Sequence, residues 1–336
     1  MDATLRTNPL LGEHSIWPSR VRGYPKSLIE SGLFTSIQST KLTDASFDVQ
    51  IAGRYYEASN QLSVRHLRVL IELIDMGKGT QCGDAIEFDL GKLVERLNWS
   101  RSGELYTELK RLIRDLADLA LSYTEVMPPI EGFSDEPDEY TVSARLFDLF
   151  EAPDWVFERG QFEEPEYDCH SKCIFAFSAE FSRIIQNDTL ITVHSRVFKD
   201  LGRSPLRTYL ALFYLGHGHD QRGIFSYSTR KLAERSGLMD RAGITGEKWI
   251  SRKKLPAFHR ALQRVKAAIR EISDLRIFRH VRISESCGNS EIYRRNLIVN
   301  VARFRMSDES QIMSLPQEFR ELYRAHLMRS LSPNPQ

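Results

Sequence analysis

The chain has 336 residues, of which 46 are lysine or arginine and 45 are aspartate or glutamate. This length favours two domains, and the ordinary apolar fraction of 41% allows each domain to bury a core. No apolar run approaches the roughly 20 residues of a membrane span, and the N-terminus lacks the order of a secretory signal. The four cysteines are too few for a disulfide framework, which favours a reducing cytoplasm.

The near-neutral total hides a charge asymmetry between the two halves. Residues 1–170 hold 17 basic and 30 acidic side chains, a net charge of −13. Residues 171–336 hold the other 29 basic and 15 acidic side chains, a net charge of +14. The second half is therefore expected to attract a polyanion and the first half, on balance, to repel it.

The elements expected in the first half follow a recognisable order. Residues 1–16 lack periodicity and are expected to form a flexible tail before a first domain over residues 17–150. Helical spacing predicts a helix over 62–76 capped by Ser63, and alternation predicts a short strand over 86–88. Asp89 is expected to cap a short helix over 90–97. A longer helix follows the turn at 98–103, and two strands over 121–127 and 140–146 close the unit.

The second half repeats this order. Residues 151–172 are acidic and aperiodic and predict a linker before a second domain over 173–306. Residues 175–198 are expected to hold one helix and one strand. A helix over 204–215, a strand over 224–227, a short capped helix, an insertion over 237–254 and a long helix over 255–273 follow. Strands over 275–283 and 292–304 form the expected hairpin, and a helical tail occupies 307–336.

A repeated pentapeptide ties the two halves together. Lys92–Arg96 reads KLVER and Lys231–Arg235 reads KLAER, an offset of 231 − 92 = 139 residues. Leu67-Arg68 matches Leu206-Arg207 at the same offset. One supersecondary unit used twice explains both matches. The sequence therefore predicts an α+β fold of two tandem winged helices, each a helix-turn-helix with a β-hairpin wing, related by internal duplication.

The long helix over 255–273 is the predicted DNA-reading element. In a winged helix the second long helix enters the major groove, where arginine suits guanine and glutamine suits adenine. Lysine and arginine also neutralise phosphates and release counterions. The predicted DNA-binding residues on this helix, its N-terminal approach and its wing are Arg252, Lys253, Lys254, His259, Arg260, Gln263, Arg264, Lys266, Arg270, Arg282, Arg294 and Arg295.

The first unit carries the opposite signal. Its hairpin loop holds five acidic residues and no lysine or arginine between Pro128 and Tyr140, so phosphates would repel it. Its long helix mixes acidic residues with secondary DNA-binding candidates, which are Arg101, Lys110, Arg111 and Arg114. We expect this unit either to contact DNA weakly or to serve mainly as a protein–protein surface.

Signals for catalysis or metal binding are poor, and no cofactor is expected. His217 and His219 resemble a metal-binding or relaxase-type histidine pair, but relaxases have an apolar residue between the histidines, and a turn after a helix explains this pair better. Cys169, His170 and Cys173 have the ligand types of a zinc site, yet the other cysteines supply no second close pair. The chain also lacks the GxxxxGK[ST] phosphate-binding loop. A non-enzymatic protein is therefore expected.

The stretch Trp17–Pro25, followed by Gly32-Leu33-Phe34, resembles the opening motif of the TrfA family of plasmid replication initiators. Residues 51–73 resemble the same family, and Leu201–Leu206 running into Leu210–Tyr214 extends the likeness. The resemblance touches most of the chain from about residue 17 to 300. More broadly, the chain is similar to iteron-binding initiators with tandem winged helices.

This resemblance implies a cytoplasmic protein that binds double-stranded iteron repeats at a plasmid origin. Such initiators promote opening of an AT-rich region, recruit the host initiator, replicative helicase and sliding clamp, and use a monomer–dimer equilibrium in copy control. Gln61-Leu62-Ser63 resembles the start of a clamp-binding peptide, although Val64-Arg65 departs from its usual ending. The alternatives are a double winged-helix transcriptional regulator and a nicking relaxase.

Overall fold

A computed structural model describes residues 21–37, 47–77, 80, 83–100, 102–127, 138–151, 172–217, 224–241, 243–244, 250–275, 280–286 and 296–302. It mixes helices and strands, so the predicted α+β class is confirmed. Contacts divide the chain into two compact units, one mainly of residues 22–192 and the other mainly of residues 193–336. None of the helices in these ranges is both long and apolar enough to cross a membrane.

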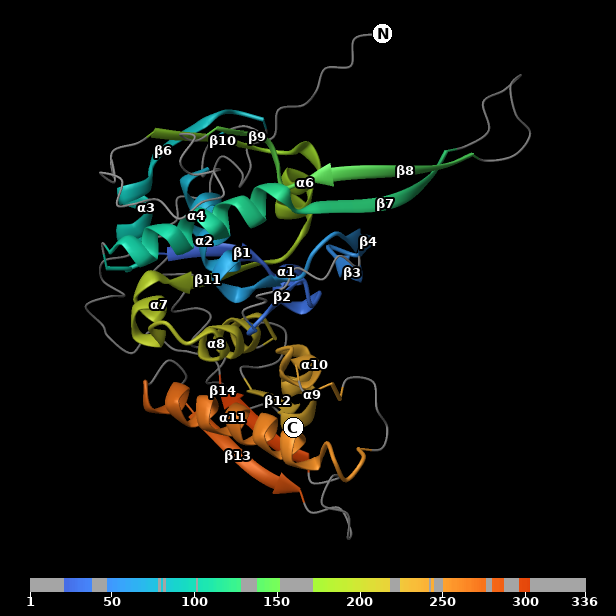
Figure 1. The fold of residues 1–336 in the computed structure, drawn as a ribbon, viewed down its shortest axis with the longest axis vertical. Helices are drawn as coiled ribbons and strands as arrows, with labels where there is room; N and C mark the ends of the chain where they lie inside the picture. The colour runs from blue at the N-terminus through green and yellow to red at the C-terminus, as the bar shows by residue number, and fades with distance from the viewer. Residues whose placement is uncertain are drawn as a thin grey trace, which may run out of the picture. The chain divides into compact units, whose positions relative to one another are not determined.

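The first unit contains sixteen described elements, drawn from blue to yellow-green in Figure 1. They are β1 (Val21–Pro25), α1 (Lys26–Glu30), β2 (Phe34–Thr35), β3 (Phe47–Ile51), β4 (Arg54–Ala58), β5 (Leu62–Ser63), α2 (Val64–Met76), β6 (Ile86–Asp89), α3 (Leu90–Arg96), α4 (Gly103–Asp118), β7 (Ala120–Met127), β8 (Asp138–Arg145), β9 (Phe147–Glu151), β10 (Lys172–Phe177), α6 (Ala179–Asn187) and β11 (Leu190–His194), which runs across the division.

Local signals set the ends of these helices as the sequence predicts. Ser63 is the N-cap of α2, and its backbone N–H donates to Nδ1 of His66 at 3.0 Å. The Asp89 side chain accepts from the backbone N–H of Lys92 at 3.1 Å and so caps α3. The leucine and isoleucine stripe of α4 is buried, as its spacing indicates.

Sheet pairing in the first unit departs from the simplest winged-helix pattern. Strands β7 and β8 form the predicted hairpin, with Met127 opposite Asp138, and they join β4 and β3 in a four-stranded sheet (Figure 1). Strand β6 does not pair with this hairpin. It pairs instead with β10, which also pairs with β9. Residues 172–177 therefore complete a sheet of the first unit, whereas the sequence-based boundary placed residues from 173 onward in the second domain.

An aromatic cluster explains why β10 joins this unit. Phe175 lies 5.7 Å from Phe88 of β6 and 5.9 Å from Phe147 of β9, measured between ring centroids. Phe177 stacks on Phe147 at 5.5 Å. Phe175 and Phe177 are almost fully buried. Burying such rings is worth several kcal/mol, roughly 1.5–3 kcal/mol for each Phe side chain.

The second unit is built from α7 (Ser195–Leu201), α8 (Pro205–His217), β12 (Ile224–Ser228), α9 (Thr229–Arg235), α10 (Leu238–Arg241), α11 (Leu255–Asp274), β13 (His280–Ser286) and β14 (Asn296–Ala302). Residues 172–201 thus hold two strands and two helices rather than the predicted one of each. The insertion contributes the short helix α10. The predicted tail over 307–336 lies outside the described residues.

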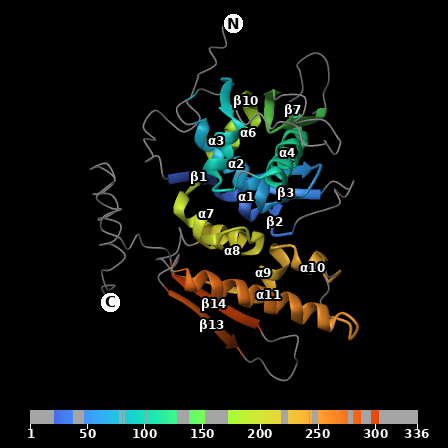
Figure 2. The ribbon, with the colours of Figure 1, turned by 60° about the vertical axis from the view of Figure 1, so that its left-hand side comes forward.

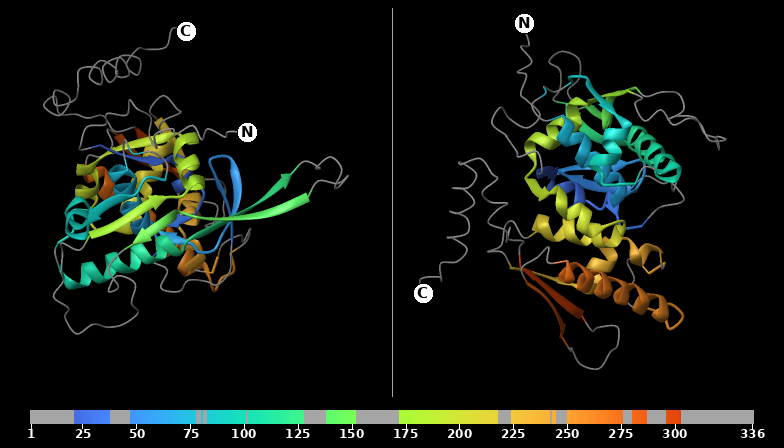
Figure 3. Two further views of the ribbon diagram at one scale, coloured as in Figure 1. Left: turned by 90° about the horizontal axis from the view of Figure 1, so that it is seen from above. Right: turned by 90° about the vertical axis from the view of Figure 1, so that its left-hand side faces the viewer.

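The sheet of the second unit has the order β12-β14-β13. Ile224 lies opposite Ala302, and His280 lies opposite the same residue from the other side. In the hairpin, His280–Ser286 pairs with Asn296–Ala302. The sequence predicted strands over 275–283 and 292–304. Helix α11 packs against β13, α8 and α9, and Figures 2 and 3 show it lying along the two hairpin strands.

Candidate nucleic-acid interface

Helix α11 buries one side and leaves the other to solvent. Its N-terminal turn holds Pro256, where the missing N–H leaves no helical bond unmade. The buried residues are Phe258, Ala261, Leu262, Val265, Ala268, Ile269 and Ile272. Because these residues recur at helical spacing and pack against α8 and α9, the opposite side of α11 faces away from the core.

Three arginines and a glutamine occupy this exposed side. Arg260, Gln263, Arg264 and Arg270 are all exposed. Within the described parts of the chain, none of the three guanidinium groups makes an ion pair. Glu271 is the nearby acid, and it lies 3.4 Å from Nη1 of Arg207 on α8. The arginines are therefore available to an external anion.

The other predicted residues on α11 are less accessible. His259 and Lys266 are only partly exposed, and the His259 ring contacts Phe258 at 5.8 Å between centroids. Of the predicted row, Gln263 and Arg270 therefore lie on the exposed side with Arg260 and Arg264, whereas His259 and Lys266 lie at its edge. Helical periodicity indicates the face but not how far it is rotated.

The residues that precede α11 are basic, as predicted. Arg252 and Lys253 are exposed. Lys254 is the N-cap residue, and its Nζ donates to the backbone carbonyl of Gly243 at 2.6 Å. This bond fastens the preceding insertion to the start of the helix, so Lys254 has a structural contact as well as a charge.

The predicted wing residues are placed only in part. Arg282 lies on β13 opposite Asn300 of β14. Arg294 and Arg295 lie outside the described residues, as does the predicted hairpin tip.

The candidate residues of the first unit are more enclosed. Arg101 lies outside the described residues, and Lys110, Arg111 and Arg114 are each partly buried. Arg111 lies 3.8 Å from Asp115, four residues along α4. Asp115 also lies 2.9 Å from Nε2 of His66, which joins α4 to α2. Acidic neighbours thus offset the basic charge of α4 locally.

When the sequences of α4 and α11 are aligned, two acidic positions of α4 correspond to arginines in α11. The match of Arg114 to Arg270 sets an offset of 270 − 114 = 156, and the last residues of α4 and α11, Asp118 and Asp274, coincide at this offset. Glu104 then corresponds to Arg260, and Glu108 corresponds to Arg264. Glu108 is further paired with Arg65 of α2. The same two helix positions therefore present acids in one unit and unpaired bases in the other.

Two basic residues on α9 were not singled out from the sequence. Lys231 and Arg235 are exposed members of the second pentapeptide. They stand on α9, which the sequence predicts to be the first helix of a helix-turn-helix, and in DNA-bound examples that helix crosses the phosphate backbone. The repeat itself suggested a structural role, so the pattern gave no signal that these side chains remain at the surface.

Metal and nucleophile candidates lie mostly outside the described residues. Cys169, His170 and His219 fall there, and His217 is the last residue of α8. Cys173 is fully buried in β10, and burial raises the pKa of its thiol to about 12. Where the structure describes the chain, no three His, Cys, Asp or Glu side chains are grouped to hold a metal.

Solved structures with a similar fold include two of RctB domains and one of an initiator protein. The structure of selenomethionine derivatives of domains 2 and 3 of RctB matches with a TM-score of 0.50 and 9% identity, over 80% of this chain and 94% of that chain. A second structure of RctB domains 2–3 has a TM-score of 0.49 and 10% identity, covering 85% and 99% of the two chains. Pi initiator protein in complex with iteron DNA has a TM-score of 0.48 and 13% identity, covering 86% and 98%.

No protein-family model matches the sequence, and no curated protein matches it. At 9% identity, the likeness to the first of these structures shows a shared fold alone.

Proposed function

We propose that this protein is a plasmid replication initiator that binds iteron repeats at its origin through helix α11. The observation that carries the proposal is the exposed row of Arg260, Gln263 and Arg264, in which the arginines have no ion pair among the described residues. Arg and Gln at successive turns of one helix suit base edges and phosphates in a major groove. The sequence resemblance to TrfA-type initiators supplies the biological setting.

The proposal includes two winged helices. In the second unit, α8, β12, α9, α11 and the β13–β14 hairpin follow the winged-helix order, and β12 pairs with the hairpin. In the first unit, α2, β6, α3, α4 and the β7–β8 hairpin repeat the order with a different partner for β6. The likeness to RctB domains 2 and 3 supports a fold shared across most of the chain.

The remaining parts of the proposal rest on the sequence resemblance. A non-enzymatic cytoplasmic initiator would bind the iterons, promote opening of the origin and bring in the host initiator, helicase and sliding clamp. A monomer–dimer equilibrium would set copy number. Because the first unit is acidic, it suits contacts with proteins better than contacts with DNA.

Footprinting on the cognate plasmid origin tests the proposal. We expect protection of tandem direct repeats at a spacing near whole helical turns, roughly 10.5 base pairs or a multiple. The variant Arg260→Gln with Arg264→Gln should lose protection, and Lys172→Gln, which removes an exposed charge on β10, should keep it. Protection of a single inverted repeat at a promoter would indicate a transcriptional regulator. No protection of origin DNA would overturn the initiator proposal.

A further inference from the structure

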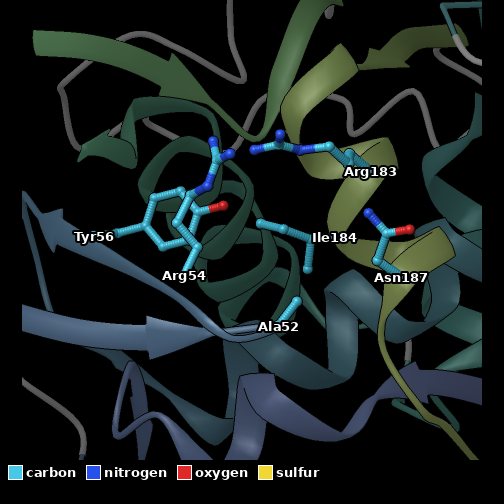
Figure 4. Close-up of a pocket in the computed structure, with 6 residues that line it drawn as sticks. All are labelled: Ala52, Arg54, Tyr56, Arg183, Ile184 and Asn187. Atoms are coloured by element: carbon cyan, nitrogen blue, oxygen red, sulfur yellow. The ribbon is translucent and has the colours of Figure 1, made fainter. Parts of the chain in front are cut away.

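A small cavity lies in the first unit between the β3–β4 turn and helix α6. Its volume is about 140 Å³, and Figure 4 shows its lining residues, Ala52, Arg54, Tyr56, Arg183, Ile184 and Asn187. This is smaller than the roughly 300–1,000 Å³ of sites for drug-sized ligands, so it suits a single small group. No sequence pattern indicated this cavity, because its two walls are more than 120 residues apart along the chain.

A tight turn and one helical face build the walls. Ile51 and Arg54 pair across the hairpin, leaving Ala52 and Gly53 as a two-residue turn with positive φ angles of 48° and 82°. Such primed turns match the twist of the strands they join. On α6, Arg183, Ile184 and Asn187 lie at helical spacing on one face. Both arginines are therefore carried by regular elements.

Stacking rather than hydrogen bonding holds Arg54 in place. The centre of its guanidinium group lies 4.4 Å from the centroid of the Tyr123 ring on β7. Its Nη1 atom is buried and has no hydrogen-bond partner among the described residues. The nearest carboxylate oxygen, Oε1 of Glu180, is 3.8 Å away, too far for a hydrogen bond. A buried guanidinium N–H without an acceptor is costly, which indicates that an acceptor is meant to reach it.

Glu180 organises the site without neutralising it. Its Oε1 accepts from the Tyr56 hydroxyl and, at 2.5 Å, from Nη2 of Arg183. Burial, followed by this bond to Glu180, raises the pKa of Tyr56 well above its ordinary value, so the hydroxyl remains a donor. One carboxylate thus faces two guanidinium groups, and the cluster retains a net charge of +1.

The two guanidinium groups point toward one another in Figure 4. Glu180 faces both groups but balances only one of the two positive charges, so a second anion would reduce the repulsion that remains. A planar guanidinium offers paired N–H donors that match two oxygens of a phosphate or carboxylate. We propose that this cavity binds one phosphate group between Arg54 and Arg183, with Asn187 at its margin.

Two ligands carry such a phosphate group: free inorganic phosphate and the phosphodiester of the DNA backbone. A singly charged phosphodiester matches the net charge of +1. In that case the site would hold DNA against a unit whose long helix is largely neutralised. Only this DNA source rests on the proposed function, because binding of inorganic phosphate needs no DNA.

A titration of the full chain with inorganic phosphate at constant ionic strength, followed by calorimetry, tests the site. We expect saturable binding with one phosphate per chain. Arg54→Gln should weaken it by about tenfold or more, because a charge-assisted hydrogen bond is lost. Asn187→Asp should also weaken it, because the new carboxylate repels the anion. Asn187 is exposed, so its substitution does not threaten folding. Lys172→Gln removes an equal charge from β10 and should leave binding unchanged.

A second arm separates the two sources by measuring DNA affinity against salt concentration. If a backbone phosphate occupies the site, Arg54→Gln should reduce the slope of log affinity against log salt by about 0.9, and Lys172→Gln should not. An unchanged slope together with phosphate binding assigns the site to free phosphate. Equal binding of acetate would make it a carboxylate site instead. The proposal is overturned if neither phosphate binding nor the salt slope responds to Arg54→Gln.

Discussion

The two units differ where the helix before each pentapeptide helix, α2 or α8, meets that pentapeptide helix. At the 139-residue offset, Glu72 and Asp75 of α2 correspond to Ala211 and Tyr214 of α8. In the first unit, Nε of Arg96 lies 2.9 Å from Glu72, and Arg96 also pairs with Asp75. Its counterpart Arg235 instead lies 6.0 Å from the centroid of the Phe213 ring and remains exposed.

Arg22 extends the network of the first unit. Its Nε lies 2.8 Å from Glu72 and its Nη1 lies 3.1 Å from Asp75, and all three side chains are buried. Burial raises the pKa of Glu72, while Arg22 and Arg96 act in the opposite direction. The network joins β1 to α2 and α3. One copy of the repeat therefore uses its arginine for internal cohesion, and the other copy leaves the equivalent arginine at the surface.

The largest expected difference between the units concerns their ion pairs. Removing the carboxylate with Glu72→Ala should destabilise the first unit by about 3–5 kcal/mol, because Arg22 and Arg96 lose a buried partner. Glu271→Ala removes a largely exposed partner of Arg207 and should cost less than about 1 kcal/mol. Hydrogen exchange of the α3 and α9 amides would measure each unit separately. Equal losses would show that burial does not distinguish the two pairs.

The next largest effect concerns DNA affinity. Neutralising Arg260 and Arg264 together should reduce affinity by about tenfold to hundredfold and lower the salt slope by nearly two, if both contact phosphate. The matched change at Arg111 and Arg114 should have a much smaller effect, since acidic neighbours already offset these charges. Titrations at fixed salt with both double variants provide the comparison. Equal losses from the two helices would contradict an unequal division of DNA contact.

The smallest expected effect concerns the caps of the pentapeptide helices. Asp89 and Ser228 occupy equivalent positions, since 228 − 89 = 139. Asp89 accepts a bond from Lys92, whereas Ser228 makes no side-chain capping bond. Asp89→Ala should therefore cost about 1 kcal/mol and Ser228→Ala only a few tenths. Urea unfolding of the two variants tests this difference, and a larger loss at Ser228 would reverse the comparison.

Local patterns predicted most of the elements but few of their partners. The spacing of apolar residues located α4 and α11, and Asp89 marked the start of α3, because these signals are contained in neighbouring residues. The pairing of β6 with β10 joins residues more than 80 positions apart, and alternation cannot specify such a partner. For the same reason the Arg54–Arg183 cavity had no signature.

The candidate DNA-binding surface on α11 could also be predicted only in part. Basic residues at helical spacing indicated that α11 presents a charged side. They did not distinguish exposed Arg260 and Arg264 from the partly buried His259 and Lys266, since the rotation of the helix depends on its packing against α8 and α9. Nor could they show that Arg111 lies beside Asp115, which depends on the side-chain geometry of α4.

The central position of β10 has a consequence for biosynthesis. Both strands that flank it, β6 and β9, leave the ribosome before it does. Until Phe175 and Phe177 emerge, the nascent chain carries two strand edges without their partner and aromatic side chains without their cover. Folding of the first unit should therefore finish only after residue 177 has been translated. A chain truncated and released after residue 151 would be a better substrate for chaperones than one released after residue 200.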